Sequence, residues 1–95
     1  MKLDHIEHIG IAVSNLDEAI KFYEEKLGLK CYAVEEVAEQ KVRTAFFKVG
    51  QTKIELLEST APDGPIGKFI EKKGQGIQHI AFAVKDLPNQ LKNAE

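Results

Sequence analysis

Two histidines, His8 and His79, stand at the head of the same short sequence, which occurs near both ends of the 95-residue chain. The first copy reads HIGIAV and the second reads HIAFAV. The likeness continues into the residues that follow, where Leu16 aligns with Leu87 at the same offset. The pattern predicts a duplicated unit made of a strand and the beginning of a helix.

Small residues are expected beside both imidazoles, because every second side chain of a strand shares one face. The expected neighbours are Ile6, Gly10 and Ala12 for His8, and Ile77, Ala81 and Ala83 for His79. Glycine and alanine leave space for a cavity next to an imidazole. A single strand histidine is more often a half-buried residue bonded to a backbone carbonyl. Two histidines at equivalent repeat positions instead favour a metal site, because imidazole is a frequent metal ligand.

Composition places the chain among ordinary globular domains, with 43% hydrophobic residues, 29% charged residues and a formal net charge of −2. These values, without a basic stripe, argue against nucleic acid as a partner. No membrane segment or signal peptide is expected, since no apolar run approaches roughly 20 residues. Cys31 is the single cysteine, which excludes an internal disulfide and suits a reducing cytoplasm. The core of so short a chain is modest, so a partner chain would add stability.

Periodicity and turn residues predict a βαβββ unit in the first half of the chain. Asn15 and the acidic residues after it predict a helix that begins near Leu16, and Gly28 is expected to end this helix. Phe22 and Tyr23 are expected in the core. The expected strands are 5–13, 30–38, 42–49 and 52–58, with turns at 39–41 and 50–51.

Glu55 lies in the last of these strands. Ile54 and Leu56 are expected on one face of it, and Lys53, Glu55 and Leu57 on the other. From the residues alone, two roles stay open for Glu55, a solvated surface side chain and a functional carboxylate.

The remaining residues predict a linker and the start of a second unit. Two prolines and a glycine mark 59–65, and we expect a short helix over 66–73, the repeated strand over 77–84 and a helix start at 86–88. The chain is therefore divided into a first βαβββ module (1–58), a linker with a short helix (59–76) and the beginning of a second, truncated module (77–95). Either the sequence is a truncation, or a second chain completes the fold, for example by exchange of the repeated element between protomers.

The βαβββ order with a repeated histidine-led strand resembles the vicinal oxygen chelate superfamily of glyoxalases, bleomycin resistance proteins and dioxygenases. Within that superfamily, several strings along all 95 residues resemble the methylmalonyl-CoA epimerase family. These strings are HIEHIGIAV at 5–13, FY before LG within 22–28, KIELLE at 53–58, GPI at 64–66 and GIQHIA at 76–81. The resemblance implies an α+β fold built from βαβββ modules, the second of which is incomplete here.

The resemblance also implies a metal site in which His8, Glu55 and His79 are ligands. The fourth ligand of the family is a glutamate near the end of the second module, and this sequence has no such position. A position on the third strand that carries glutamate in some relatives is Thr44 here. The resemblance therefore leaves the residues that move a proton unknown.

The implied reaction is a 1,1-proton transfer that interconverts (2R)- and (2S)-methylmalonyl-CoA through an enolate, which a divalent metal ion stabilises. The implied ion is cobalt, nickel, manganese or zinc, and the implied substrate is a CoA thioester. From the short chain, the incomplete second module and the single cysteine, we expect a cytoplasmic homodimer, with or without exchanged elements.

Three alternatives stay open. One is an enzyme of the lactoylglutathione lyase type from the same superfamily, and another is a metal-free module that binds a small ligand in the same cavity. The third is that this truncated chain is inactive and serves only as a structural or folding unit.

Overall fold

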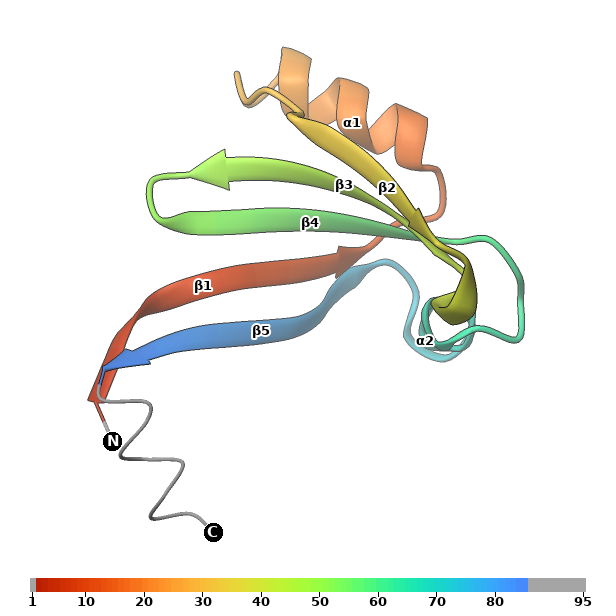
Figure 1. Ribbon diagram of the computed structural model, residues 1–95. Helices are drawn as coiled ribbons and strands as arrows, with labels where there is room; N and C mark the ends of the chain where they lie inside the picture. The colour runs from red at the N-terminus through yellow and green to blue at the C-terminus, as the bar shows by residue number, and fades with distance from the viewer. Residues whose placement is uncertain (1, 86–95) are drawn as a thin grey trace, which may run out of the picture.

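A mixed five-stranded sheet in the order β2-β3-β4-β1-β5 forms the centre of the structure, a computed structural model that describes residues 2–85 (Figure 1). Its strands are β1 (Lys2–Ala12), β2 (Ala33–Val37), β3 (Val42–Val49), β4 (Thr52–Ser59) and β5 (Gly76–Lys85). The helices are α1 (Leu16–Glu25), α2 (Pro65–Lys73) and the short 3₁₀ helix η1 (Ala38–Gln40). Strand β1 is parallel to β4 and antiparallel to β5, whereas β3 is antiparallel to both β2 and β4. The predicted α+β class is confirmed.

Most predicted elements are present, with shifts at their ends. Strand β3 spans the predicted residues, β4 extends to Ser59, and α2 begins at Pro65. Strand β2 is shorter than expected, and η1 overlaps the predicted turn at 39–41. The helix start predicted at 86–88 lies outside the described residues. In the part of the chain that the structure describes, no helix is long and apolar enough to cross a membrane.

Helix α1 begins where the sequence predicts because its first amides find acceptors. The side-chain oxygen of Asn15 accepts a hydrogen bond from the amide of Glu18 at 3.1 Å. A carboxylate oxygen of Glu58, on β4, accepts from the amide of Leu16 at 2.9 Å. The sheet and the cap together fix the position of the helix.

The end of α1 departs from the prediction. The helix stops at Glu25, and Gly28 takes up the left-handed conformation (φ 70°) in the turn that follows. Tyr23 packs on Phe47 of the sheet, with ring centroids 5.5 Å apart. The prediction that Phe22 is a core residue is wrong, since it is 54% exposed beside the apolar stripe of the helix.

The two faces of the sheet carry different clusters of buried residues. Helix α1 covers one face over β3 and β4, and the cluster there consists of Val13, Leu16, Ala45, Phe47 and Leu56. Helix α2 lies at one end of the opposite face, where the cluster consists of Ala12, Val42, Leu57 and Ile66 (Figure 1). We call this second face the open face, because α2 covers it only at that end.

Strand β1 contains a bulge at Glu7. Ile6 pairs with Phe82, and His8 pairs with the adjacent Ala81, so Glu7 has no register partner on β5. Because consecutive residues of β5 point to opposite faces, Ile6 and His8 also lie on opposite faces. The prediction that they share a face is wrong, because it assumed unbroken alternation.

Strand β5 contains a matching bulge at Gln78. Gly10 pairs with His79 and Ile11 pairs with Ile77, which leaves Gln78 as the extra residue. His79 and Ile77 therefore lie on opposite faces, again contrary to the prediction. The other predicted neighbours do share the open face with the histidines: Gly10, Ala12, Ala81 and Ala83.

Candidate metal centre

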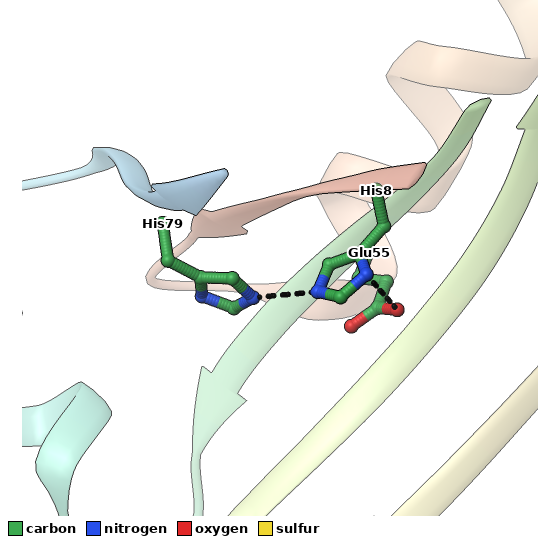
Figure 2. A group of neighbouring side chains, drawn as sticks. All are labelled: His8, Glu55 and His79. Carbon is green, nitrogen blue, oxygen red and sulfur yellow. Dashed lines mark hydrogen bonds and ion pairs between the residues drawn. The ribbon is translucent and has the colours of Figure 1, made fainter. Parts of the chain in front are cut away.

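Three side chains from adjacent strands converge on the open face: His8 from β1, Glu55 from β4 and His79 from β5 (Figure 2). Gly10 of β1 accounts for the convergence, because it is the register partner of both Glu55 and His79. His8 precedes Gly10 by two residues on the same face. One potential ligand atom from each of the three side chains lies within 4.8 Å of the others. The structure thus brings together the three residues that the resemblance implies as ligands.

The two imidazoles approach through their Nε2 atoms, which are 3.0 Å apart, and their rings are nearly perpendicular at 84°. Without an ion, this contact is a hydrogen bond in which one ring donates and the other accepts. Two nitrogens bound to one ion at about 2.1 Å lie roughly 3.0–3.4 Å apart when the angle at the ion is about 90–109°. The observed separation is therefore compatible with two ligands of a single ion.

The carboxylate of Glu55 completes this donor set. Its Oε2 atom is 3.9 Å from Nδ1 of His8, and the two side chains are 17% and 23% exposed. Imidazole and carboxylate groups together suit a first-row divalent ion. The residues present therefore fit a divalent metal ion.

Each of these histidines is also held at its other ring nitrogen, Nδ1, by the residue that precedes it. Glu7 bonds Nδ1 of His8, and its second oxygen accepts from Nζ of Lys53 at 3.1 Å. Oε1 of Gln78 is 2.5 Å from Nδ1 of His79. The hydrogen bond with His8, then that with Lys53, lowers the pKa of Glu7, and Glu7 in turn raises the pKa of Lys53. Sequence reasoning missed Glu7 and Gln78, although a signal was present, because each directly precedes a repeated histidine.

A cavity of about 440 Å³ opens beside the site on the open face. Its apolar wall comes from β2, β3, β4 and α2 and is formed by Val37, Val42, Phe46, Leu57, Pro65 and Ile66. Its polar residues are Gln40, Thr44, Glu55, Gln78 and His79. Among the described residues that line the cavity, Glu55 is the only carboxylate.

Thr44 lies on β3 and is buried, with 6% of its surface exposed. It lines the same cavity as Glu55 and His79. Thr44, at which the resemblance implies a glutamate in some relatives, thus lies next to the candidate metal site.

The fold and the site together define the class of protein. Residues 4–95 match the Glyoxalase/Bleomycin resistance protein/Dioxygenase superfamily, and the chain belongs to this family. The predicted membership of the vicinal oxygen chelate superfamily is confirmed, whereas the division of the chain into two modules and a linker stays a prediction.

The chain is also similar in sequence to individual proteins. The chain is 48% identical over 89 residues to the uncharacterized protein YqjC of Bacillus subtilis, covering 94% of this chain and 64% of that protein. It is 34% identical over 87 residues to the mitochondrial methylmalonyl-CoA epimerase of Mus musculus, covering 90% of this chain and 49% of that protein. The chain thus spans about half to two thirds of the length of these relatives.

A solved structure of a methylmalonyl-CoA epimerase is similar to this chain. It is a variant of Streptomyces coelicolor methylmalonyl-CoA epimerase in complex with 2-nitronate-propionyl-CoA. The TM-score is 0.85 at 35% identity, and the match covers 98% of this chain and 69% of that chain. The chain is therefore similar in both sequence and fold to methylmalonyl-CoA epimerases.

Proposed function

We propose that the protein is an isomerase that interconverts (2R)- and (2S)-methylmalonyl-CoA by removing the C2 proton and returning a proton on the other face. The observation that carries the proposal is the convergence of His8, Glu55 and His79 beside a cavity, in a chain that is 34–35% identical to methylmalonyl-CoA epimerases. The CoA ester bound to the Streptomyces relative supports a CoA thioester as the substrate class.

In this proposal His8 and His79 bind a divalent ion through imidazole nitrogens and Glu55 binds it through its carboxylate. When bound, the ion acts as a Lewis acid that stabilises negative charge on the thioester oxygen as the C2 proton leaves. Cobalt, nickel, manganese and zinc all suit the donor set. The contribution of the chain is to hold its ligands in place on three hydrogen-bonded strands, so that little rearrangement is needed for binding.

The cavity next to the ligands suits a small acyl group. Apolar residues such as Phe46 and Leu57 can contact a methyl group, whereas the Thr44 hydroxyl and the Gln78 amide can bond oxygen atoms. Glu55, the only carboxylate among the described cavity residues, is assigned to the ion. The described cavity residues therefore offer no second carboxylate to take the C2 proton. A homodimer and a cytoplasmic location are part of the proposal.

Deuterium incorporation at C2 of methylmalonyl-CoA tests the reaction. The full chain is loaded with cobalt and incubated with the substrate in heavy water, and the C2 proton signal is followed by NMR. We expect the wild type to exchange this proton and His79→Ala to lose the exchange. His5→Ala is the matched control, because His5 lies on β1 but bonds Asp4 at 2.9 Å rather than joining the site.

The outcomes separate the alternatives. If cobalt-loaded protein neither exchanges C2 nor interconverts the two epimers, the epimerase proposal fails. Conversion of a glutathione hemithioacetal into a glutathione thioester instead would favour the lactoylglutathione lyase type. A protein that binds no cobalt, zinc, nickel or manganese, and whose ligand binding is unchanged by His8→Ala, would favour a metal-free module.

A further inference from the structure

We propose that Glu7 and Gln78 are a pair of positioning residues, each of which fixes Nδ1 of the histidine that follows it so that Nε2 faces the metal ion. The inference rests on the proposed function, because it concerns the same site. It deepens that function by assigning a role to two side chains that are not themselves ligands.

The two bulges make these contacts possible. In a regular strand, consecutive side chains point to opposite faces, so a residue cannot reach the histidine next to it. Glu7 and Gln78 are the extra residues of the bulges in β1 and β5, and a bulge re-aims the side chains around it. Each bulge brings an oxygen acceptor to Nδ1 of the next residue, Glu7 to His8 and Gln78 to His79. The same device occurs at the same position of both repeats.

The contacts select one tautomer of each ring. An acceptor at Nδ1 holds the ring proton there and leaves Nε2 with a free lone pair, which is the form that binds a metal. Two ligands of one ion would both carry their proton on Nδ1 and present the lone pairs of their Nε2 atoms, which are 3.0 Å apart in His8 and His79. Without an ion, one of the two rings carries its proton on Nε2 in the hydrogen bond between them, so acceptors at both Nδ1 atoms favour the ion-bound form over this contact.

His8 needs its positioning residue because a competing acceptor is near. Oε2 of Glu55 lies 3.9 Å from the same Nδ1. Without Glu7, a bond from Nδ1 to Glu55 would turn one ligand toward another and away from the ion. Lys53 keeps Glu7 in place through its contact with the second oxygen at 3.1 Å.

The two positioning residues differ in charge. Glu7 is an anion anchored by Lys53, whereas Gln78 is a neutral amide that lines the cavity. A carboxylate makes the imidazole that it bonds a more basic ligand than an amide does. We therefore expect the charge at positions 7 and 78 to set the affinity of the site for its ion.

Cobalt affinity of the full chain, measured by calorimetry and by the visible absorption of bound cobalt, tests the inference. We expect Glu7→Gln to weaken the affinity about 10- to 100-fold and Gln78→Glu to strengthen it. The combined variant should bind within a few-fold of the wild type, because one charge is removed and one is added.

Asp4→Asn is the matched control. Asp4 precedes His5 at another register shift of β1 and lies 2.9 Å from Nδ1 of His5, away from the ligands. Its substitution removes one charge from the same strand, as Glu7→Gln does, and should leave the cobalt affinity unchanged. An equal loss in both variants would show a general charge effect and would overturn the inference.

A metal-free readout separates this inference from the proposed function. In protein with ¹⁵N-labelled histidine and no ion, NMR should show that the fraction of His8 with its proton on Nδ1 falls in Glu7→Leu, which offers no acceptor. Unchanged affinity in both Glu7→Gln and Gln78→Glu, together with an unchanged tautomer, overturns the positioning role and leaves the metal site intact. If the wild type binds no cobalt, the metal site and the inference fail together. If Glu7→Gln does not fold, the cobalt affinity of Gln78→Glu, on the other strand, tests the inference.

Discussion

The imidazole of His79 lies directly against Gly10 of the neighbouring strand. A Cβ atom at residue 10 would lie 2.2 Å from Cε1 and 2.6 Å from Nδ1 of this ring, closer than real contacts allow. Any side chain at residue 10 must therefore displace the ring. Because Gly10 pairs with Glu55 on its other side, it sits between two of the three candidate ligands.

Gly10→Ala should weaken cobalt binding at least about tenfold, because the added methyl group pushes His79 away from His8. Gly50→Ala is the control. Gly50 has a φ of 61° with nothing within 4 Å of its Cβ position, so alanine there should cost about 1 kcal/mol of stability without changing cobalt affinity. Calorimetric titration and thermal unfolding of both variants make the comparison. Wild-type affinity in Gly10→Ala would contradict the placement of the ring.

The histidines of the site could be predicted from the sequence, but Glu55 could not be predicted from its residues alone. His8 and His79 stand out because they head a repeat. Glu55 alternates with Lys53 and Leu57, a pattern that also fits a surface strand, and only the resemblance singles it out. Its approach to the histidines depends on β1 lying between β4 and β5, and no local pattern encodes such a pairing of distant strands.

The contacts of Glu7 and Gln78 with the histidines could not be predicted from the sequence, for a different physical reason. Strict alternation places each of them on the face opposite its histidine, and a bulge reverses this. Bulges arise from the pairing of two strands rather than from the sequence of one, so the same error misplaced Ile6 and Ile77. Strand β3 was predicted to the residue because its β-branched and aromatic run ends at the turn of Gly50, where the cause is local.

The packing of α1 on the sheet predicts a contrast between two phenylalanines. Phe47 is fully buried between the sheet and α1, so Phe47→Ala should lower the free energy of unfolding by about 3–5 kcal/mol. Phe22 is 54% exposed, so Phe22→Ala should cost less than about 1 kcal/mol. Urea denaturation measures both. Similar losses in the two variants would mean that α1 presents a different face to the sheet.

The ion pair between Lys41 and Asp63 predicts a pH effect on stability. Nζ of Lys41 lies 2.5 Å from Oδ2 of Asp63, and the hydrogen bond with this ammonium lowers the pKa of the Asp63 carboxyl. A carboxyl whose pKa is lower in the folded state stabilises the fold above its unfolded pKa, and this contribution is lost as the pH falls through the folded value.

Asp63→Asn should therefore be less stable than the wild type at neutral pH, and the difference should shrink below about pH 4. The urea concentrations at the unfolding midpoint of both proteins, measured from about pH 2 to pH 7, test this expectation. The difference is expected to be small, because the pair is exposed to solvent. A stability difference that grows as the pH falls would reverse the expected pH dependence and would contradict the pairing.

Thr44 offers a gain-of-function test of the chemistry. Its side chain lines the cavity with Glu55 and His79, where the resemblance places a glutamate in some relatives. Glu55 is the only carboxylate among the described cavity residues, and Thr44→Glu would add a second. Burial raises the pKa of such a group toward the working pH, which favours a general base. We expect C2 exchange with cobalt to rise about 100-fold, by analogy with the usual contribution of a positioned base.

Thr44→Gln has nearly the same shape as Thr44→Glu and no ionisable group, so it should show no gain. A rise in both variants would mean that the effect comes from shape rather than proton transfer, and a rise in neither would mean that a base at this position does not limit the reaction.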